Sequence, residues 1–331
     1  MTRIGWIDYA KGIAILLVVI GHVLRGLISS QILIESPLTQ YIDNWIYSFH
    51  MPVFFMIAGL FVLKSAQKSL IAFLSDKLCT IVYPYFLWST IQSIIMIAFA
   101  GSTNNNIKWA DIWKIIYQPI MQFWFLYALF IMLLIFITLY KMRVPLIGIF
   151  LFTLIVFCLK FYLPTDSHVN SLVQSTCANM VFFGIGFLGR DVLLNRLSKL
   201  STEALIKFSL ASFISLSVLV VLGLQLNYFG RLVTASLGII GTISLSTVLE
   251  RLKLASEIQR YGLLSLHIFL AHIIMAAAAR IILMKVFKID NSLIHLGLGT
   301  LAGTYGPILL QNLSQKARFP YLFTSPRLRT D

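Results

Sequence analysis

Three ionisable side chains lie on one face of the first long apolar segment. Asp8 and Lys11 come at its start, and His22 follows eleven residues after Lys11. Eleven steps of about 100° make nearly three full helical turns, so Lys11 and His22 share a face and stand ~16 Å apart along the axis. An ammonium at a membrane surface can hold a phosphate, and an imidazole deeper on the same face can act as a general base or a nucleophile.

Both residues also have ordinary structural explanations. Lys11 can snorkel to the headgroups with Asp8 as its local ion-pair partner, and His22 can hydrogen-bond to a neighbouring helix. However, an ionisable side chain costs ~3 kcal/mol in the middle of a span, so its presence there indicates a function. We therefore predict that His22 and Lys11 are functional and that Asp8 orients Lys11.

Three further histidines, His50, His267 and His272, lie inside apolar segments. His50 precedes Pro52, which removes a helical hydrogen bond, so a kink there can open a polar cavity; an interfacial histidine in an aromatic belt is the alternative. His272 follows His267 by five residues. That spacing places the two rings on different faces of a helix and excludes a simple metal-ligand pair.

One aromatic and one cationic residue complete the set of candidates. Trp124 begins an apolar segment within an aromatic run, which an aromatic belt at the membrane surface also explains. Lys77 ends a basic loop over residues 64–77, which can bind phosphates or simply follow the positive-inside rule.

The three cysteines are far apart in apolar stretches, so the sequence predicts neither a disulfide framework nor a metal site.

The composition shows which elements must position these side chains. Of 331 residues, 59% are hydrophobic and 11% are charged, whereas soluble domains carry about 25% charged residues. This excludes an ordinary soluble globule, a disordered chain and a free nucleic-acid-binding domain. Because a span needs about 20 apolar residues, we predict an all-α, polytopic membrane helix bundle of about ten helices. The expected spans are 12–30, 44–63, 80–100, 120–140, 145–163, 173–189, 207–224, 232–249, 261–283 and 293–313.

Basic residues predict the orientation of these spans. The formal net charge is +14, from 26 Lys+Arg against 12 Asp+Glu. With the N-terminus inside, only eight basic residues fall on the outer side: Arg25, Lys108, Lys114, Lys160, Arg231, Arg280, Lys285 and Lys288. The positive-inside rule then favours both termini in the cytoplasm. We expect one transmembrane domain over residues 1–315 and a short cytoplasmic tail over 316–331.

Glycines mark two spans. Residues 184–189 read GxGxxG, but they lie in an apolar helix with no preceding strand, so a dinucleotide site is not predicted. Gly297, Gly299 and Gly303 in the last span indicate close helix packing.

Four segments together resemble the acyltransferase 3 family of integral membrane acyltransferases. They are residues 6–22 (WIDYAKGIAILLVVIGH), 49–55 (FHMPVFF), 124–127 (WFLY) and 265–272 (SLHIFLAH). Their order and the expected spans cover nearly the whole chain. The first segment is closest to the subgroup labelled fucose 4-O-acetylase-like.

The chain departs from the family pattern at its cationic positions. Lys11 stands where the family has an Arg that ten intervening residues separate from its histidine, and Lys77 and Thr80 stand where relatives carry Arg-x-x-Arg. Ala58 replaces a frequent Ser before Gly59. Lysine keeps the charge but loses the bidentate fork of arginine, so contacts to the donor are expected to differ.

The resemblance implies transfer of an acyl group, usually acetyl, from cytosolic acetyl-CoA to a hydroxyl. The acceptor would be a bacterial cell-surface polysaccharide or its lipid-linked precursor, in the inner (plasma) membrane, with no metal and no nucleic acid involved. Lys11 and Lys77 would hold the donor's phosphates, and His22 would act as base or carry the acetyl group. His272, together with His50 and Trp124, would lie on the acceptor side.

Two other classes of function remain open from the sequence. A transporter or flippase for a glycolipid or small solute could use the same histidines as proton relays, although no internal repeat and no pair of broken helices is evident. An inactive partner in polysaccharide biosynthesis is the third possibility. Binding of acetyl-CoA separates the acyltransferase from both.

Overall fold

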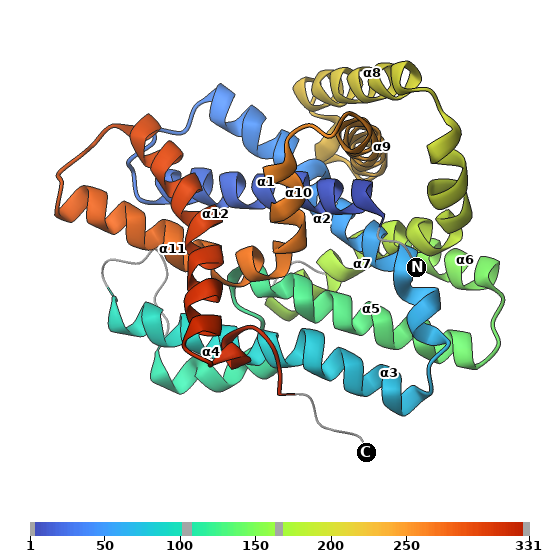
Figure 1. The fold of residues 1–331 in the computed structure, drawn as a ribbon, viewed down its shortest axis with the longest axis horizontal. Coiled ribbons are helices and arrows are strands. Elements are labelled where there is room, and N and C mark those ends of the chain that lie inside the picture. The colour runs from blue at the N-terminus through green and yellow to red at the C-terminus, as the bar shows by residue number, and fades with distance from the viewer. Residues whose placement is uncertain (1–3, 101–107, 163–167, 327–331) are drawn as a thin grey trace. The chain divides into compact units, whose positions relative to one another are not determined.

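The computed structural model describes residues 4–100, 108–162 and 168–326, and within these ranges the chain is helical with no strand, as predicted (Figure 1). Arg3, Arg327 and Arg329, expected on the cytoplasmic side, lie outside the described residues. The helices are α1 (Gly5–Ser29), α2 (Pro37–Ala66), α3 (Leu70–Lys77), α4 (Tyr83–Ala98), α5 (Trp124–Lys141), α6 (Leu146–Leu159), α7 (His168–Leu188), α8 (Thr202–Val221), α9 (Tyr228–Leu252), α10 (Ser256–Leu263), α11 (Ser265–Lys285) and α12 (Ser292–Lys316).

In the described part of the chain, nine helical stretches are long and apolar enough to cross a membrane. The tenth expected span, 145–163, is wrong in length, since α6 has only 14 residues and reaches ~21 Å. Its outward residues are nevertheless apolar at every fourth position: Ile147, Leu151, Ile155 and Leu159. This spacing puts them on one helix face, so α6 also presents an apolar stripe.

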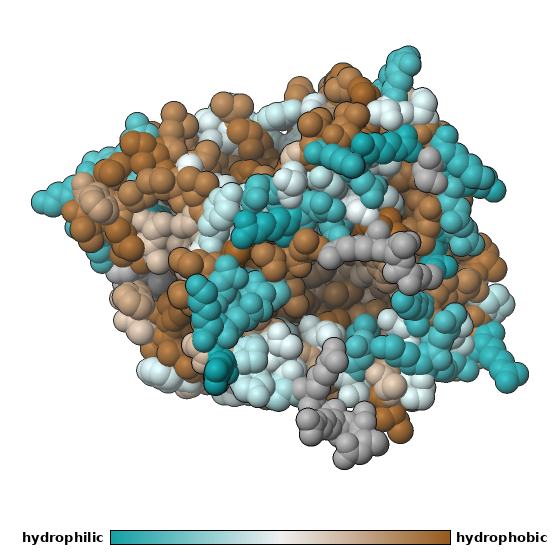
Figure 2. Space-filling view, in the orientation of Figure 1, coloured by the Kyte–Doolittle hydropathy of each residue, from teal (hydrophilic) through white to brown (hydrophobic). Residues whose placement is uncertain are grey.

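Large apolar side chains are exposed along several other helices. On α8 the exposed stripe runs through Ile206, Leu210, Ile214 and Val218, with Ile214 63% exposed. Figure 2 shows apolar residues spread over the face in view. Water-soluble proteins do not expose apolar surface on this scale. The chain is therefore an integral, multi-pass membrane protein whose outward stripes face lipid.

The chain forms two compact units, each made of two separate segments. The first unit contains Met1–Phe54 and Leu194–Leu310, and the second contains Phe55–Leu193 and Gln311–Asp331. Five candidate residues belong to the first unit: Asp8, Lys11, His22, His50 and His272. Lys77 and Trp124 belong to the second.

In the first unit, α1 and α10 approach each other at the level of their backbones (Figure 1). A Cβ added at Gly12 would lie 1.8 Å from the Ile258 carbonyl oxygen, and one added at Gly262 would lie 1.7 Å from that of Asp8. The helix boundaries here also differ from the expected span 261–283, which begins too early. Residues up to Leu263 form the separate helix α10 against α1, and α11 begins at Ser265.

The glycines of α7 and α12 differ in whether another helix packs against them. The GxGxxG residues lie at the end of α7, and a Cβ at Gly186 would meet the Met56 carbonyl oxygen at 2.0 Å, so this glycine serves helix packing. Gly299 and Gly303 lie against valines of α1, as expected for close packing. The prediction is wrong for Gly297, where an added Cβ would meet nothing within 4 Å.

Candidate active site

The helix α1 carries three of the predicted residues without interruption. Since Lys11 and His22 lie on one continuous helix, their separation of ~16 Å and their common face follow from helix geometry. The Lys11 ammonium lies 3.1 Å from the Asp8 carboxylate, as an i,i+3 pair. The Lys11 side chain is 27% exposed and that of Asp8 only 6%, so the ammonium remains accessible to a ligand while the carboxylate is buried.

Close packing by α9 and α10 holds this end of α1 in place. Gly262 allows the α10 backbone to lie against the carbonyl of Asp8. The Tyr9 hydroxyl donates a hydrogen bond of 2.8 Å to the Leu254 carbonyl, just after α9. Asp8 also stands in the first turn of α1, where the helix dipole favours a negative charge. The Asp8–Lys11 pair therefore has a fixed position at the start of the helix.

His22 lies in a cluster of rings contributed by three helices. The ring centroid of His272, from α11, is 5.2 Å away, and that of Tyr47, from α2, is 6.2 Å away in an edge-on arrangement. His22 is half-buried. The structure thus brings together two histidines that are far apart in the sequence, and it leaves part of the His22 surface accessible.

The His272 ring has one nitrogen bound and one nitrogen free. Its Nδ1 lies 2.8 Å from the Phe269 carbonyl oxygen and 3.1 Å from that of Ile268. A nitrogen facing carbonyl oxygens must carry the proton, so in the neutral ring Nε2 is a hydrogen-bond acceptor. This Nε2 is buried and has no hydrogen-bond partner among the described residues. The ring can therefore accept a hydrogen bond from a ligand.

His50 lies in the same cluster but is more constrained. It is buried, and its Nδ1 lies 2.6 Å from the Ile46 carbonyl oxygen. Its ring stands edge-on to Tyr47 with centroids 4.7 Å apart. The helix α2 continues through Pro52. Among the described residues, no three His, Cys, Asp or Glu side chains are arranged to hold a metal ion.

Three residues of this cluster were not found from the sequence. The Arg25 guanidinium carbon lies 3.2 Å from the centre of the Tyr47 ring, and Asp43 holds the guanidinium through two hydrogen bonds of 2.6 and 2.8 Å. Arg25 follows His22 by three residues, so the two side chains lie near the same face of α1. This three-residue spacing is the signal in the sequence that could have identified Arg25 as a neighbour of His22. Nothing in the sequence indicates that the Tyr47 ring contacts both the Arg25 guanidinium and the His22 ring.

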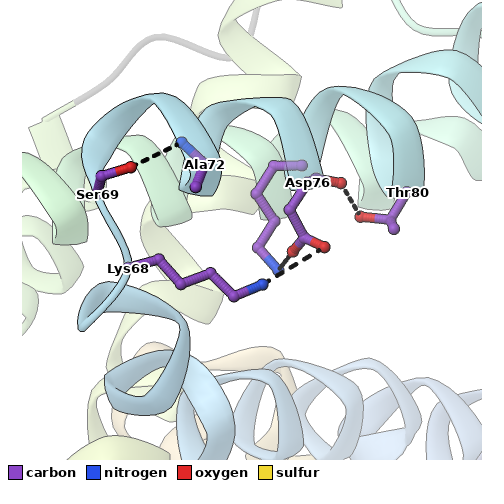
Figure 3. A network of polar contacts seen from close by, with 6 residues as sticks. Lys68, Ser69, Ala72, Asp76 and Thr80 are labelled. Carbon is purple, nitrogen blue, oxygen red and sulfur yellow. Dashed lines mark hydrogen bonds and ion pairs between the residues drawn. The ribbon is translucent and has the colours of Figure 1, made fainter. Parts of the chain in front are cut away.

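In the second unit, Lys77 is already paired. Its ammonium lies 2.8 Å from the Asp76 carboxylate, which Lys68 also approaches at 3.8 Å (Figure 3). Thr80, at the family's second arginine position, donates a hydrogen bond of 2.7 Å to the Asp76 carbonyl. Trp124 is half-buried, with its ring 6.2 Å from that of Phe55. Lys77 therefore contributes less free positive charge than the sequence indicates.

The fold and the histidine cluster define an all-helical membrane protein with acid–base groups inside its helices. The family model described as an acyltransferase domain matches residues 4–311, so the chain belongs to the acyltransferase 3 family. It is also similar to the nodulation protein NolL of Mesorhizobium japonicum, with 31% identity over 130 residues. This match covers 38% of the chain and 32% of NolL, about a third of the length of that relative. No solved structure matches the chain.

Proposed function

We propose that the protein is a membrane O-acetyltransferase. It moves acetyl from cytosolic acetyl-CoA to a sugar hydroxyl of a bacterial cell-surface polysaccharide or its lipid-linked precursor, in the inner membrane. The observation that supports this best is the half-buried His22 in ring contact with His272, on the helix that also carries the Lys11–Asp8 pair. Membership of the acyltransferase 3 family supports acyl transfer.

The proposed reaction assigns one role to each end of α1. With the N-terminus in the cytoplasm, Lys11 lies at the cytosolic surface and binds a phosphate of acetyl-CoA. The ~16 Å between Lys11 and His22 is then bridged by the pantetheine arm, which brings the thioester to the histidine. The acceptor is bound from the other side, where we place His272 and His50 of the first unit.

His22 acts as a general base in this scheme. It removes the proton of the sugar hydroxyl, and the oxygen attacks the thioester carbonyl carbon. The carbon–sulfur bond then breaks, the new ester remains on the sugar, and the CoA thiolate takes the proton from His22. The free Nε2 of His272 accepts a hydrogen bond in the same cluster and orients either His22 or the incoming hydroxyl.

A direct test combines binding and product analysis. The purified protein in lipid nanodiscs should bind acetyl-CoA, and glycans of cells that express it should show a mass increase of one acetyl group relative to cells that lack it. Unchanged glycan masses with altered glycan export would favour a transporter. Acetyl-CoA binding without any acetylated product would contradict the proposed transfer reaction.

Lys11 offers a prediction about donor binding. Lys11→Ala should weaken acetyl-CoA binding by roughly 10- to 150-fold, because a charge-assisted hydrogen bond to phosphate contributes roughly 1.5–3 kcal/mol. Lys11→Arg should bind at least as well as the wild type, since arginine can contact phosphate with two hydrogen bonds. Isothermal titration with acetyl-CoA measures both. Equal affinities for the wild type and Lys11→Ala would remove Lys11 from the donor site.

Lys77 is expected to have a smaller effect. Because Asp76 already neutralises it in part, Lys77→Ala should raise the KM for acetyl-CoA only about twofold to fivefold, the range of a partly exposed ion pair. Lys68→Ala is the matched control, since it removes the other cation near the same carboxylate. Steady-state kinetics at low salt checks this. A KM unaffected by Lys77→Ala would show that Lys77 does not bind the donor.

A further inference from the structure

We propose that the Tyr47 hydroxyl is a second catalytic group, which donates a hydrogen bond to the thioester carbonyl oxygen as that oxygen becomes negatively charged. This inference rests on the proposed acetyl transfer and adds a residue to it. It also assigns a role to Arg25 and Asp43, which the acid–base scheme leaves unused.

The hydroxyl-bearing end of the Tyr47 ring has a defined position beside α1. A Cβ added at Gly21 would lie 2.9 Å from Cε2 and 3.4 Å from Cζ of Tyr47, and Cζ carries the hydroxyl. The far end of the ring, and not its base, therefore lies against α1 one residue before His22. Gly21 leaves the space that this approach requires. The phenol thus reaches the region where His22 would meet a substrate.

Two buried polar atoms near His22 have unused hydrogen-bonding capacity. The Tyr47 hydroxyl is buried and has no hydrogen-bond partner among the described residues, and the same holds for Nε2 of His272. Leaving a buried polar group unpaired costs ~1–3 kcal/mol. One free donor and one free acceptor, each on a ring that neighbours His22, complement the two polar atoms of the reaction, a carbonyl oxygen that gains charge and a hydroxyl that loses its proton.

Arg25 and Asp43 support the Tyr47 ring. The Arg25 guanidinium lies against the ring at 3.2 Å from its centre, and Asp43 fixes the guanidinium in a bidentate pair. A cation over the face of the ring attracts its electron density, which makes the hydroxyl a stronger donor. The pair also holds the ring in one orientation, as a preorganised oxyanion site requires. Arg25 and Asp43 are therefore positioning residues for Tyr47.

The participation of Tyr47 changes neither the electron count nor the path of the proton in the transfer step. When the sugar oxygen attacks, the carbonyl π electrons move to the carbonyl oxygen, and the Tyr47 hydroxyl stabilises that charge while it keeps its proton. The electrons return when the carbon–sulfur bond breaks and the thiolate leaves. The proton still travels from the sugar to His22 and then to CoA, so Tyr47 stabilises charge and transfers no proton.

The test removes only the hydroxyl. Tyr47→Phe in the full-length protein in nanodiscs should lower kcat by ~10²–10³-fold, the usual effect of losing one oxyanion donor. The KM for acetyl-CoA should change less than twofold, and the melting temperature should stay equal or rise, since no existing hydrogen bond is lost. Transfer of radiolabelled acetyl to membranes of a strain that lacks the protein supplies the assay. Tyr41→Phe, on the same helix, is the matched control and should retain wild-type kcat.

A double-mutant cycle tests the positioning role. Arg25→Gln should lower kcat by about tenfold in the wild type and have no further effect in the Tyr47→Phe background, because both changes act on one hydroxyl. A Tyr47→Phe variant with kcat within threefold of an active wild type would overturn this inference and leave the proposed function intact. A wild type that transfers no acetyl group would overturn the proposed function and this inference with it.

Discussion

His22→Ala is expected to abolish acetyl transfer, with a loss of ~10²–10⁴ in kcat. The reason is that His22 is the half-buried acid–base group at the meeting point of α1, α2 and α11. Acetyl-CoA binding should remain within about twofold of the wild type, because the phosphate contact that we propose for Lys11 is ~16 Å away along the helix. Titration with acetyl-CoA and radiolabel transfer measure the two quantities separately.

His267→Ala is the matched control for this experiment. It also removes a histidine from a membrane-spanning helix, but on a different face of α11 from His272. This variant should keep most of its transfer activity at normal abundance in the membrane. Full glycan acetylation in cells that carry His22→Ala, at wild-type abundance, would eliminate His22 as the base.

Gly262→Ala is expected to have the largest effect on stability. The new Cβ would lie 1.7 Å from the Asp8 carbonyl oxygen and 2.9 Å from the Gly12 nitrogen, and both are backbone atoms that no side-chain rotation can move. Overpacking of this kind costs about 1–3 kcal/mol or more. The helix α10 must shift away from α1, which uncovers Asp8. We expect a lower melting temperature in nanodiscs and weaker acetyl-CoA binding.

Gly297→Ala provides the control for Gly262→Ala. It is the same substitution in a helix of the same unit, at a position where the new Cβ meets nothing within 4 Å. Its melting temperature should be unchanged or slightly higher, because alanine favours a helix interior by ~1 kcal/mol over glycine. Equal melting temperatures for the two variants would show that the contact between α1 and α10 does not limit stability.

Local patterns in the sequence were sufficient to predict the helical architecture. Long apolar runs have to form helices in a membrane because every backbone polar group needs an internal partner. The same local rule placed Asp8, Lys11 and His22 on one face of α1, and the structure shows that helix unbroken. Helix ends were less predictable. The short α6 and the break before Ser265 depend on neighbouring helices that the local pattern does not contain.

The partners of these side chains were not predictable in the same way. The sequence predicted a phosphate-binding role for Lys77, but its ammonium is paired with the carboxylate of Asp76, which directly precedes it in the chain. Gly297 and Gly303 look equivalent in the sequence, yet only Gly303 lies against another helix. A glycine shows that close approach is permitted, and the neighbouring helix decides whether it occurs.

A membrane helix bundle of the acyltransferase 3 type, and one helix face carrying a carboxylate, an ammonium and an imidazole, are thus predictable from the residues alone. The contacts of His272 and Tyr47 with His22, and the support of the Tyr47 ring by Arg25 and Asp43, become visible only in the folded chain. The difference arises because the rise and rotation of one helix are set by local backbone geometry. Contacts between helices depend instead on the packing of side chains that lie far apart in the chain.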